Sequence, residues 1–262
     1  MQQTGQIADR PKRSRRRRRL WGLLAAIVLV VLVDAWIVEP RWIRIRHVPL
    51  AAEPTMRLVH ISDLHYKGDQ RYLQRIVRLI NRLEPQYVCF TGDLIEDADN
   101  LDAVLGVLGR IQCPVFGVPG NHDWHSRAPA SRIDEALRRD GGRWLRDEAI
   151  TVNGATFYGA TGHSRRRTLP ADTGKNVLLC HYPDIVHAVA DQRYDLILAG
   201  HSHGGQVRLP WVGALYLPNR VGPYDRGLHQ TPVGPLYVNC GLGTFRLPVR
   251  FFCRPEITVI SF

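Results

Sequence analysis

The chain has 262 residues, enough for one sizeable domain and an additional segment. Its hydrophobic fraction of 45% and charged fraction of 23% are ordinary for a globular protein, which excludes a chain that is disordered throughout. The net charge is +11, but residues 1–19 carry seven of these charges, and the remainder is only mildly basic. We therefore expect no nucleic-acid partner for the rest of the chain.

Residues 20–38 form a 19-residue apolar run that only Asp34 interrupts, about the length that one helix needs to cross a bilayer. Trp21 and Trp36 lie near its ends, where interfacial aromatic residues occur. Because the basic cluster precedes the run, the positive-inside rule predicts a single-pass anchor in the inner (cytoplasmic) membrane. The amino terminus is then cytoplasmic and the following domain extracytoplasmic. A cleaved signal peptide is the alternative, although the bulky residues after the run offer no small-residue cleavage site.

The chain after the anchor alternates between strand-like and helix-like patterns. Residues 39–55 have prolines near both ends, and we expect a linker there. Asn153 and Gly154 predict a hairpin turn between two strands. This order predicts an α/β domain with mixed sheets. The expected strands cover 56–62, 87–90, 114–118, 149–152, 155–160, 176–180, 196–200, 235–241 and 256–262, and the expected helices cover 72–83, 101–108 and 131–139.

Five of the expected strands are followed at once by side chains that can bind metal ions. In α/β sheets, ligand sites assemble at the carboxyl ends of the strands. Each residue alone has an ordinary explanation, such as a helix cap, a turn or a core histidine, but their coincidence at five strand ends favours one shared site. The residues are Asp63, His65, Asp93, Asn121, His122, Asp123, His181, His201 and His203.

The types of side chain indicate which ions this site would bind. Carboxylates, imidazoles and one amide oxygen, without cysteine, suit Mn, Fe or Zn rather than a structural thiolate zinc site. The candidates are too many for one tetrahedral ion, and they fit two ions that share one carboxylate. His201 and His203 are two positions apart in an extended segment, so both imidazoles can face one pair of ions.

The ordered motifs SDLH, TGDL, GNHD, Cys180-His181 and GHSH resemble the calcineurin-like metallophosphoesterase superfamily. GHSHGGQVRLP, YDRGL and GLGTFRLPVRFFCRPEI further resemble its membrane-associated or exported bacterial phosphodiesterases. The resemblance covers about residues 56–262 and implies two mixed β-sheets in a sandwich flanked by helices, a four-layer fold. The expected organisation is a basic cytoplasmic tail (1–19), a transmembrane anchor (20–38), a linker (39–55) and a metallophosphoesterase domain (56–262).

The resemblance also implies a role for each motif residue. One ion would be bound by Asp63, His65 and His203, and the other by Asn121, His181 and His201, with Asp93 between them. A metal-bound hydroxide would attack phosphorus, and His122 would stabilise the developing charge or protonate the leaving oxygen.

The resulting hypothesis is a phosphoester hydrolase with two Mn, Zn or Fe ions, and most consistently a phosphodiesterase acting at or near the membrane. Two alternatives stay open: a noncatalytic, membrane-tethered metal-binding module, and a pyrophosphatase of a nucleotide–lipid substrate. Pyrophosphatases of one related branch carry Arg where this chain has His122, which argues mildly against the second.

A few other polar residues are weaker candidates. Arg226 and Arg246 are possible phosphate contacts, whereas Arg165–Arg167 fit a solvated loop. Glu96 and Asp97 could orient a ligand or His122, and could equally cap the next helix. His60, inside an expected strand, is predicted to lie in the core or behind the site.

Overall fold

The protein is described by a computed structural model over residues 12–162 and 174–262. The first eleven residues of the basic tail, and the expected loop Arg165–Arg167, lie outside these ranges. The first of two large sheets has the strand order β1–β14–β2–β3–β4–β5. Strands β2 to β5 are parallel, whereas β14 is antiparallel to β2 and parallel to β1. Their bounds are β1 (Arg44–Pro49), β2 (Arg57–Ile61), β3 (Tyr87–Phe90), β4 (Val115–Gly117), β5 (Arg143–Trp144) and β14 (Glu256–Ser261).

The second sheet has the order β12–β13–β9–β8–β7–β6, with a parallel centre and antiparallel edges. As predicted, Asn153 and Gly154 form the turn between β6 and β7, and both have the positive φ that a tight hairpin turn of this kind requires. The bounds are β6 (Glu148–Val152), β7 (Ala155–Ala160), β8 (Lys175–Cys180), β9 (Leu196–Ala199), β12 (Gly227–Thr231) and β13 (Gly234–Val238). A separate hairpin joins β10 (Arg208–Leu209) to β11 (Gly213–Ala214).

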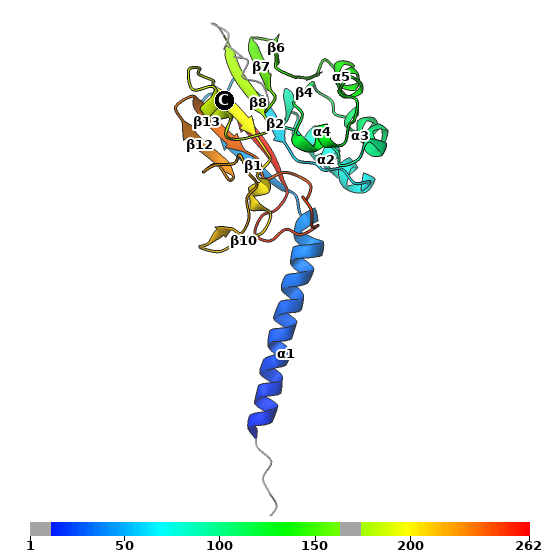
Figure 1. The fold of residues 1–262 in the computed structure, drawn as a ribbon, viewed down its shortest axis with the longest axis vertical. Helices are drawn as coiled ribbons and strands as arrows, with labels where there is room; N and C mark the ends of the chain where they lie inside the picture. Colours follow the sequence, from blue (N-terminus) through cyan, green and yellow to red (C-terminus); the bar gives the residue numbers. More distant parts are fainter. Residues whose placement is uncertain (1–11, 163–173) are drawn as a thin grey trace, which may run out of the picture.

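The two sheets pack face to face between helices, which confirms the predicted sandwich (Figure 1). Phe116 of β4 stacks on Phe157 of β7 in the core between the sheets, with ring centroids 4.3 Å apart. The outer face of the first sheet is covered by α2 (Gln70–Arg82), α3 (Leu101–Leu108) and α5 (Ala130–Arg138). The short helix α6 (Ile185–Ala188) packs on the second sheet. A further short helix, α4 (Asn121–His125), follows β4.

The amino-terminal helix extends from this sandwich as a separate rod (Figure 1). It comprises α1 (Lys12–Val33), a π-helical turn (Asp34–Val38) and a 3₁₀ turn (Glu39–Arg41). The segment Arg16–Arg41 is long and apolar enough to cross a membrane, and 6% of its apolar window is buried. A signal sequence near an amino terminus has the same length and composition.

Residues 39–55, which we expected to be a linker, include a strand of the first sheet. Strand β1 pairs with β14 over its whole length, from Arg44 opposite Glu256 to Pro49 opposite Ser261. The sequence did not reveal this strand. Only Val48 among the residues of β1 is buried, so the segment lacks the regular alternation of buried apolar and exposed polar side chains. Its place depends on the free edge of β14, which is distant in sequence.

Hydrogen bonds join the end of the amino-terminal helix to the loop before β14. The backbone N–H of Arg250 donates to the Ala35 carbonyl (2.9 Å). The buried carboxylate of Glu39 accepts the backbone N–H groups of Phe252 (2.9 Å) and Cys253. The helix is therefore fixed to the domain by buried polar contacts.

Replacing Glu39 by Ala should lower the free energy of unfolding by about 1–3 kcal/mol, because two backbone N–H groups lose their acceptor. Denaturant unfolding of the full chain in detergent measures this. Glu53→Ala, which removes an exposed carboxylate, is the matched control and should change stability little. Equal stability of the two variants would contradict the structural role of Glu39.

Candidate metal centre

Eight of the nine residues predicted to share one site lie together at one edge of the two sheets. They come from the segments after β2, β3, β4, β8 and β9. This gathering follows from the parallel pairing, because parallel strands end at the same edge. The residues are Asp63, His65, Asp93, Asn121, His122, His181, His201 and His203.

The first cluster consists of Asp63, His65 and His203, whose candidate ligand atoms all lie within 4.8 Å of one another. The Nε2 atoms of His65 and His203 are 3.0 Å apart. Nε2 of His203 lies 3.5 Å from Oδ1 of Asp63. Three donors of these types can surround one cation.

The second cluster consists of Asp93, His181 and His201, with the same mutual spacing. Nδ1 of His201 lies 3.1 Å from Nε2 of His181, and the amide oxygen of Asn121 lies 3.1 Å from the same Nε2. Asp93 stands between the clusters, because its Oδ2 lies 3.4 Å from Nε2 of His65 and 3.3 Å from Nε2 of His181. One carboxylate is thus within reach of both candidate ion positions.

In each histidine, the hydrogen bond of the ring nitrogen that points away from the centre shows whether the other nitrogen presents a lone pair to the centre. Nδ1 of His181 lies 2.8 Å from the Thr91 carbonyl, and Nε2 of His201 lies 2.9 Å from the Asn219 carbonyl. A carbonyl oxygen only accepts, so each of these nitrogens carries the hydrogen. In the neutral rings, Nε2 of His181 and Nδ1 of His201 then face each other as acceptors. Two acceptors 3.1 Å apart need either a proton or a metal ion between them.

His65 follows the same pattern in the first cluster. Its Nδ1 lies 2.6 Å from Oε1 of Glu96, which accepts the hydrogen, so Nε2 faces His203 as an acceptor. Such a hydrogen bond to a carboxylate commonly fixes the orientation of a metal-binding histidine. Both clusters therefore present imidazole nitrogens and carboxylate oxygens at close range, a donor set that fits two metal ions.

The pKa values of the central residues also indicate a need for positive charge. Burial lowers the pKa of His181, but the adjacent Asp93 carboxylate outweighs this effect and raises it to about 9. Burial raises the pKa of Asp93, yet His181 and His65 hold it well below its usual range. The buried carboxylate of Asp93 therefore requires a positive charge beside it. Either a proton on a neighbouring histidine or a metal ion can supply this charge.

The backbone at the site adopts a conformation that side chains rarely favour. Asp63, His65, Asp93, His201 and His203 all have φ between 42° and 66°. Such left-handed conformations cost on the order of 1–3 kcal/mol each in the least favourable cases, and they gather at functional sites. They occur at five candidate ligands, in the turns after β2, β3 and β9.

Gly120 permits a close approach of the turns after β3 and β4. A Cβ atom at this position would lie 2.1 Å from Oδ1 of Asp93, well inside any contact distance. The loop after β4 can therefore reach Asp93 only with glycine here.

His122 lies at the edge of the centre, beside Glu96. Its Nδ1 is 3.0 Å from Oε2 of Glu96, so one carboxylate holds the Nδ1 atoms of both His122 and His65. Burial lowers the pKa of His122, but Glu96 and Asp93 outweigh it and the pKa is raised. The sequence left two roles open for Glu96 and Asp97, to orient a ligand or His122 or to cap the next helix. Glu96 orients His122 and His65. Asp97 caps a short helix by accepting the backbone N–H of Asp99.

Asp123 has a supporting role that its sequence position did not reveal. Its buried carboxylate accepts the backbone N–H groups of Asp93, Leu94 and Gly120, each at 2.8 Å. It thereby fixes the loop after β3 to the loop after β4. The only signal in the sequence was its place in the GNHD motif beside two candidate ligands.

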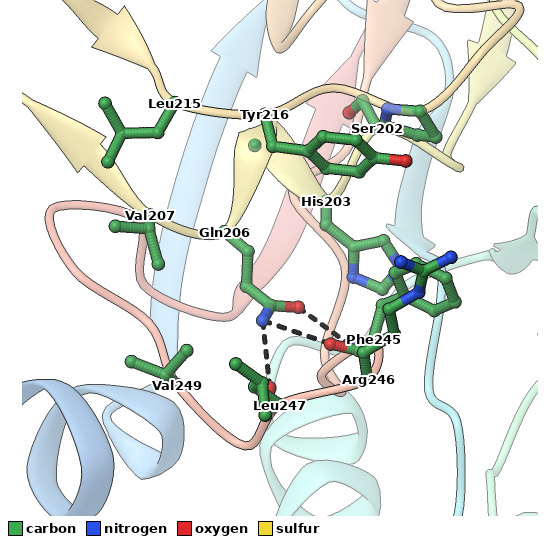
Figure 2. A pocket seen from close by; sticks show the side chains of 12 residues that line it. Ser202, His203, Gln206, Val207, Leu215, Tyr216, Phe245, Arg246, Leu247 and Val249 are labelled. Carbon is green, nitrogen blue, oxygen red and sulfur yellow. Dashed lines mark hydrogen bonds between the residues drawn. The ribbon is translucent and has the colours of Figure 1, made fainter.

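Three weaker candidates are also placed by the structure. His60 is buried in β2 with Nε2 2.9 Å from Oγ1 of Thr91, a core position as expected. Arg246 lines a pocket together with His203 (Figure 2). Arg226 instead lies beside the carbonyl of Phe252, at 3.5 Å.

Comparison with known proteins agrees with this architecture. The family model for calcineurin-like phosphoesterases matches residues 56–205, which span the five strand ends. The chain is 32% identical to the uncharacterized metallophosphoesterase YkuE of Bacillus subtilis, over 77% of this chain and 75% of that protein. It is 28% identical to the phosphodiesterase YaeI of Escherichia coli, over 85% and 89% of the two chains. It is also 26% identical to the UDP-2,3-diacylglucosamine pyrophosphatase LpxG of Chlamydia muridarum, over 78% and 83%. The chain belongs to the calcineurin-like phosphoesterase family and is a metal-dependent phosphoesterase.

Proposed function

We propose that the protein is a membrane-anchored phosphodiesterase that uses two metal ions. The observation that carries this proposal is the shared position of Asp93, whose Oδ2 lies 3.3–3.4 Å from one histidine of each cluster. A carboxylate shared by two sets of imidazole and carboxylate donors is an arrangement that suits a two-metal centre. The relative YaeI, named as a phosphodiesterase, supports a diester as substrate.

The residues would divide between the two ions as the family resemblance implies, which agrees with the two clusters described above. Asp63, His65 and His203 would hold one ion, Asn121, His181 and His201 the other, and Asp93 both. When bound, the two ions supply Lewis-acid polarisation of the phosphoryl oxygens and activation of water. The protein's part is to hold the ligand atoms in place and to orient the substrate between them.

His122 is proposed to protonate the leaving oxygen. Glu96 holds its Nδ1, which leaves Nε2 as the atom that can carry a transferable proton. The raised pKa of the ring favours the protonated form that a general acid needs. The ring remains at the rim of the centre because α4 begins at Asn121 and the His122 N–H donates to Oδ1 of Asp93 (2.8 Å).

The anchor is proposed to place this centre on the extracytoplasmic side of the inner membrane. Eight basic residues precede the apolar run and three follow it closely, so the charge difference favours a cytoplasmic amino terminus. The apolar helix is exposed along its length, as a helix in contact with lipid would be.

Asp93→Asn should reduce diester hydrolysis by about 10³-fold or more, because the variant loses the charge that holds both ions. The assay uses bis(p-nitrophenyl) phosphate with Mn, Zn or Fe, and metal content is measured in parallel. Asp99→Asn, which changes an exposed acid nearby, should keep both activity and metal. If the wild-type protein hydrolyses no monoester, diester or pyrophosphate with any of these metals, the enzymatic proposal is contradicted. If the protein instead prefers a pyrophosphate, the class of substrate that the relative LpxG is named for, a pyrophosphate replaces the diester as the proposed substrate class.

His122→Ala should lower kcat by roughly 10²–10⁴-fold for a diester with an alkyl leaving group, since general acid catalysis contributes about this much. The loss should be far smaller with p-nitrophenol, which leaves without needing a proton. Metal content should stay at the wild-type value, and His125→Ala, an exposed change in the same helix, should behave as wild type. Equal losses with both leaving groups would rule out proton donation by His122.

A reporter that is active only outside the cytoplasm should give a signal when it is fused after Phe262 and none when it is fused before Met1. The expected reason is the retention of the basic tail in the cytoplasm. The opposite pattern would reverse the proposed orientation, and loss of residues 1–38 from the mature protein would support a cleaved signal peptide instead.

A further inference from the structure

An apolar groove begins beside His203 and leads away from the metal centre. Its volume is about 270 Å³, close to the lower end of ligand pockets, which hold roughly 300–1,000 Å³. Figure 2 shows the aliphatic side chains around the groove, with Gln206 in the middle of the group. The apolar lining consists of Val207, Leu215, Tyr216, Pro218, Leu247 and Val249.

The inner end of the groove adjoins the candidate catalytic residues. The Phe245 ring lies 5.4 Å from the His122 ring and 6.2 Å from the His203 ring. The Arg246 guanidinium lies over the Phe245 ring at 5.0 Å, and no acidic side chain among the described residues pairs with it. A phosphoryl group at the metal centre would therefore sit beside a free cation, with the apolar groove continuing from it.

The outer end of the groove adjoins the amino-terminal helix. Val249 lines the groove, and the next residue, Arg250, donates its backbone N–H to the Ala35 carbonyl. In Figure 2 the pale blue helical segment lies directly beyond Val249. The groove thus connects the metal centre with the end of the helix that we propose to span the membrane.

The hairpin of β10 and β11 exposes apolar side chains at this same end of the domain (Figure 1). Trp211 at its tip is fully exposed, and Val212 is 70% exposed. Leu215 and Leu247, on the groove itself, are more than half exposed. A contiguous exposed apolar surface marks a protein or membrane contact, and its continuity with the helix favours the bilayer.

The groove is a fixed feature rather than a gap between loose loops. The Gln206 amide nitrogen donates to the carbonyls of Phe245 (3.3 Å) and Leu247 (3.0 Å), and its oxygen accepts the Phe245 N–H (2.7 Å). These three bonds hold Phe245 and Leu247 against the segment that leads into the hairpin. A chain entering the groove would meet a formed wall, at little cost in ordering.

We propose that this groove holds the alkyl chain of a lipid phosphoester while its phosphoryl group lies at the metal centre. The substrate class is then an amphiphile drawn from the bilayer, with the chain lying along Val207, Leu215 and Leu247 and Arg246 beside the headgroup phosphate. This inference rests on the proposed phosphodiesterase activity and adds the identity of its substrate's apolar part.

The test compares two p-nitrophenyl phosphodiesters that differ only in their second ester group, methyl or dodecyl, with the full chain in nanodiscs. Wild-type protein should hydrolyse the dodecyl ester with a kcat/KM at least about tenfold higher, because methylene groups gain free energy on burial. Leu247→Asp and Leu215→Asp each place a charge in the groove and should abolish this preference. Both variants should retain wild-type hydrolysis of the methyl ester.

Leu228→Asp is the matched control, because it changes a partly exposed leucine on β12, outside the groove lining. It should keep the preference, which separates occupancy of the groove from simple partitioning of the dodecyl ester into the nanodisc. Equal kcat/KM for the two esters in wild type, or an unchanged preference in both groove variants, would overturn the proposal. Absence of hydrolysis of the methyl ester by wild type would instead refute the underlying activity.

Discussion

A fully buried carboxylate, that of Asp93, is the constraint on which this architecture depends. A charge removed from water is costly unless partners surround it. The partners are the backbone N–H of His122 and the rings of His65 and His181. These three partners follow three different strands, β4, β2 and β8. The parallel pairing of the strands and the electrostatics of the site therefore depend on each other.

The gathering of the site was predictable from the sequence because it needs little more than strand order. Buried apolar runs identify β2, β3, β4, β8 and β9, and parallel strands bring their carboxyl ends to one edge. Helix α3 was predicted with its observed bounds, because four buried residues recur at the spacing of one helix face. Local periodicity was thus enough for the elements that bury an apolar face of their own.

Features that depend on distant partners were not predictable in the same way. Strand β1 carries one buried residue and owes its place to β14, more than 200 residues later in the chain. The carboxylate of Glu96 was an open choice in the sequence, and only the fold brings both His65 and His122 to it. Asp123 looked like a further candidate ligand, whereas its three acceptor bonds go to backbone N–H groups. Sequence spacing gives the type of a side chain but not which of its neighbours takes its hydrogen bonds.

The pairing of β1 changes what the amino-terminal helix can do for the site. With a flexible linker over residues 39–55, a tethered domain would sample many orientations above a membrane. In this protein β1 is paired throughout, and Glu39 accepts the N–H groups of Phe252 and Cys253. The Sγ atom of Cys253 in turn lies 3.3 Å from the carbonyl oxygen of His203. The end of the helix is therefore linked through one short loop to a candidate metal ligand. Such a linkage fixes the position of the centre relative to the end of the helix. The apolar groove lies at this junction, because its lining residue Val249 directly precedes Arg250, which bonds to Ala35.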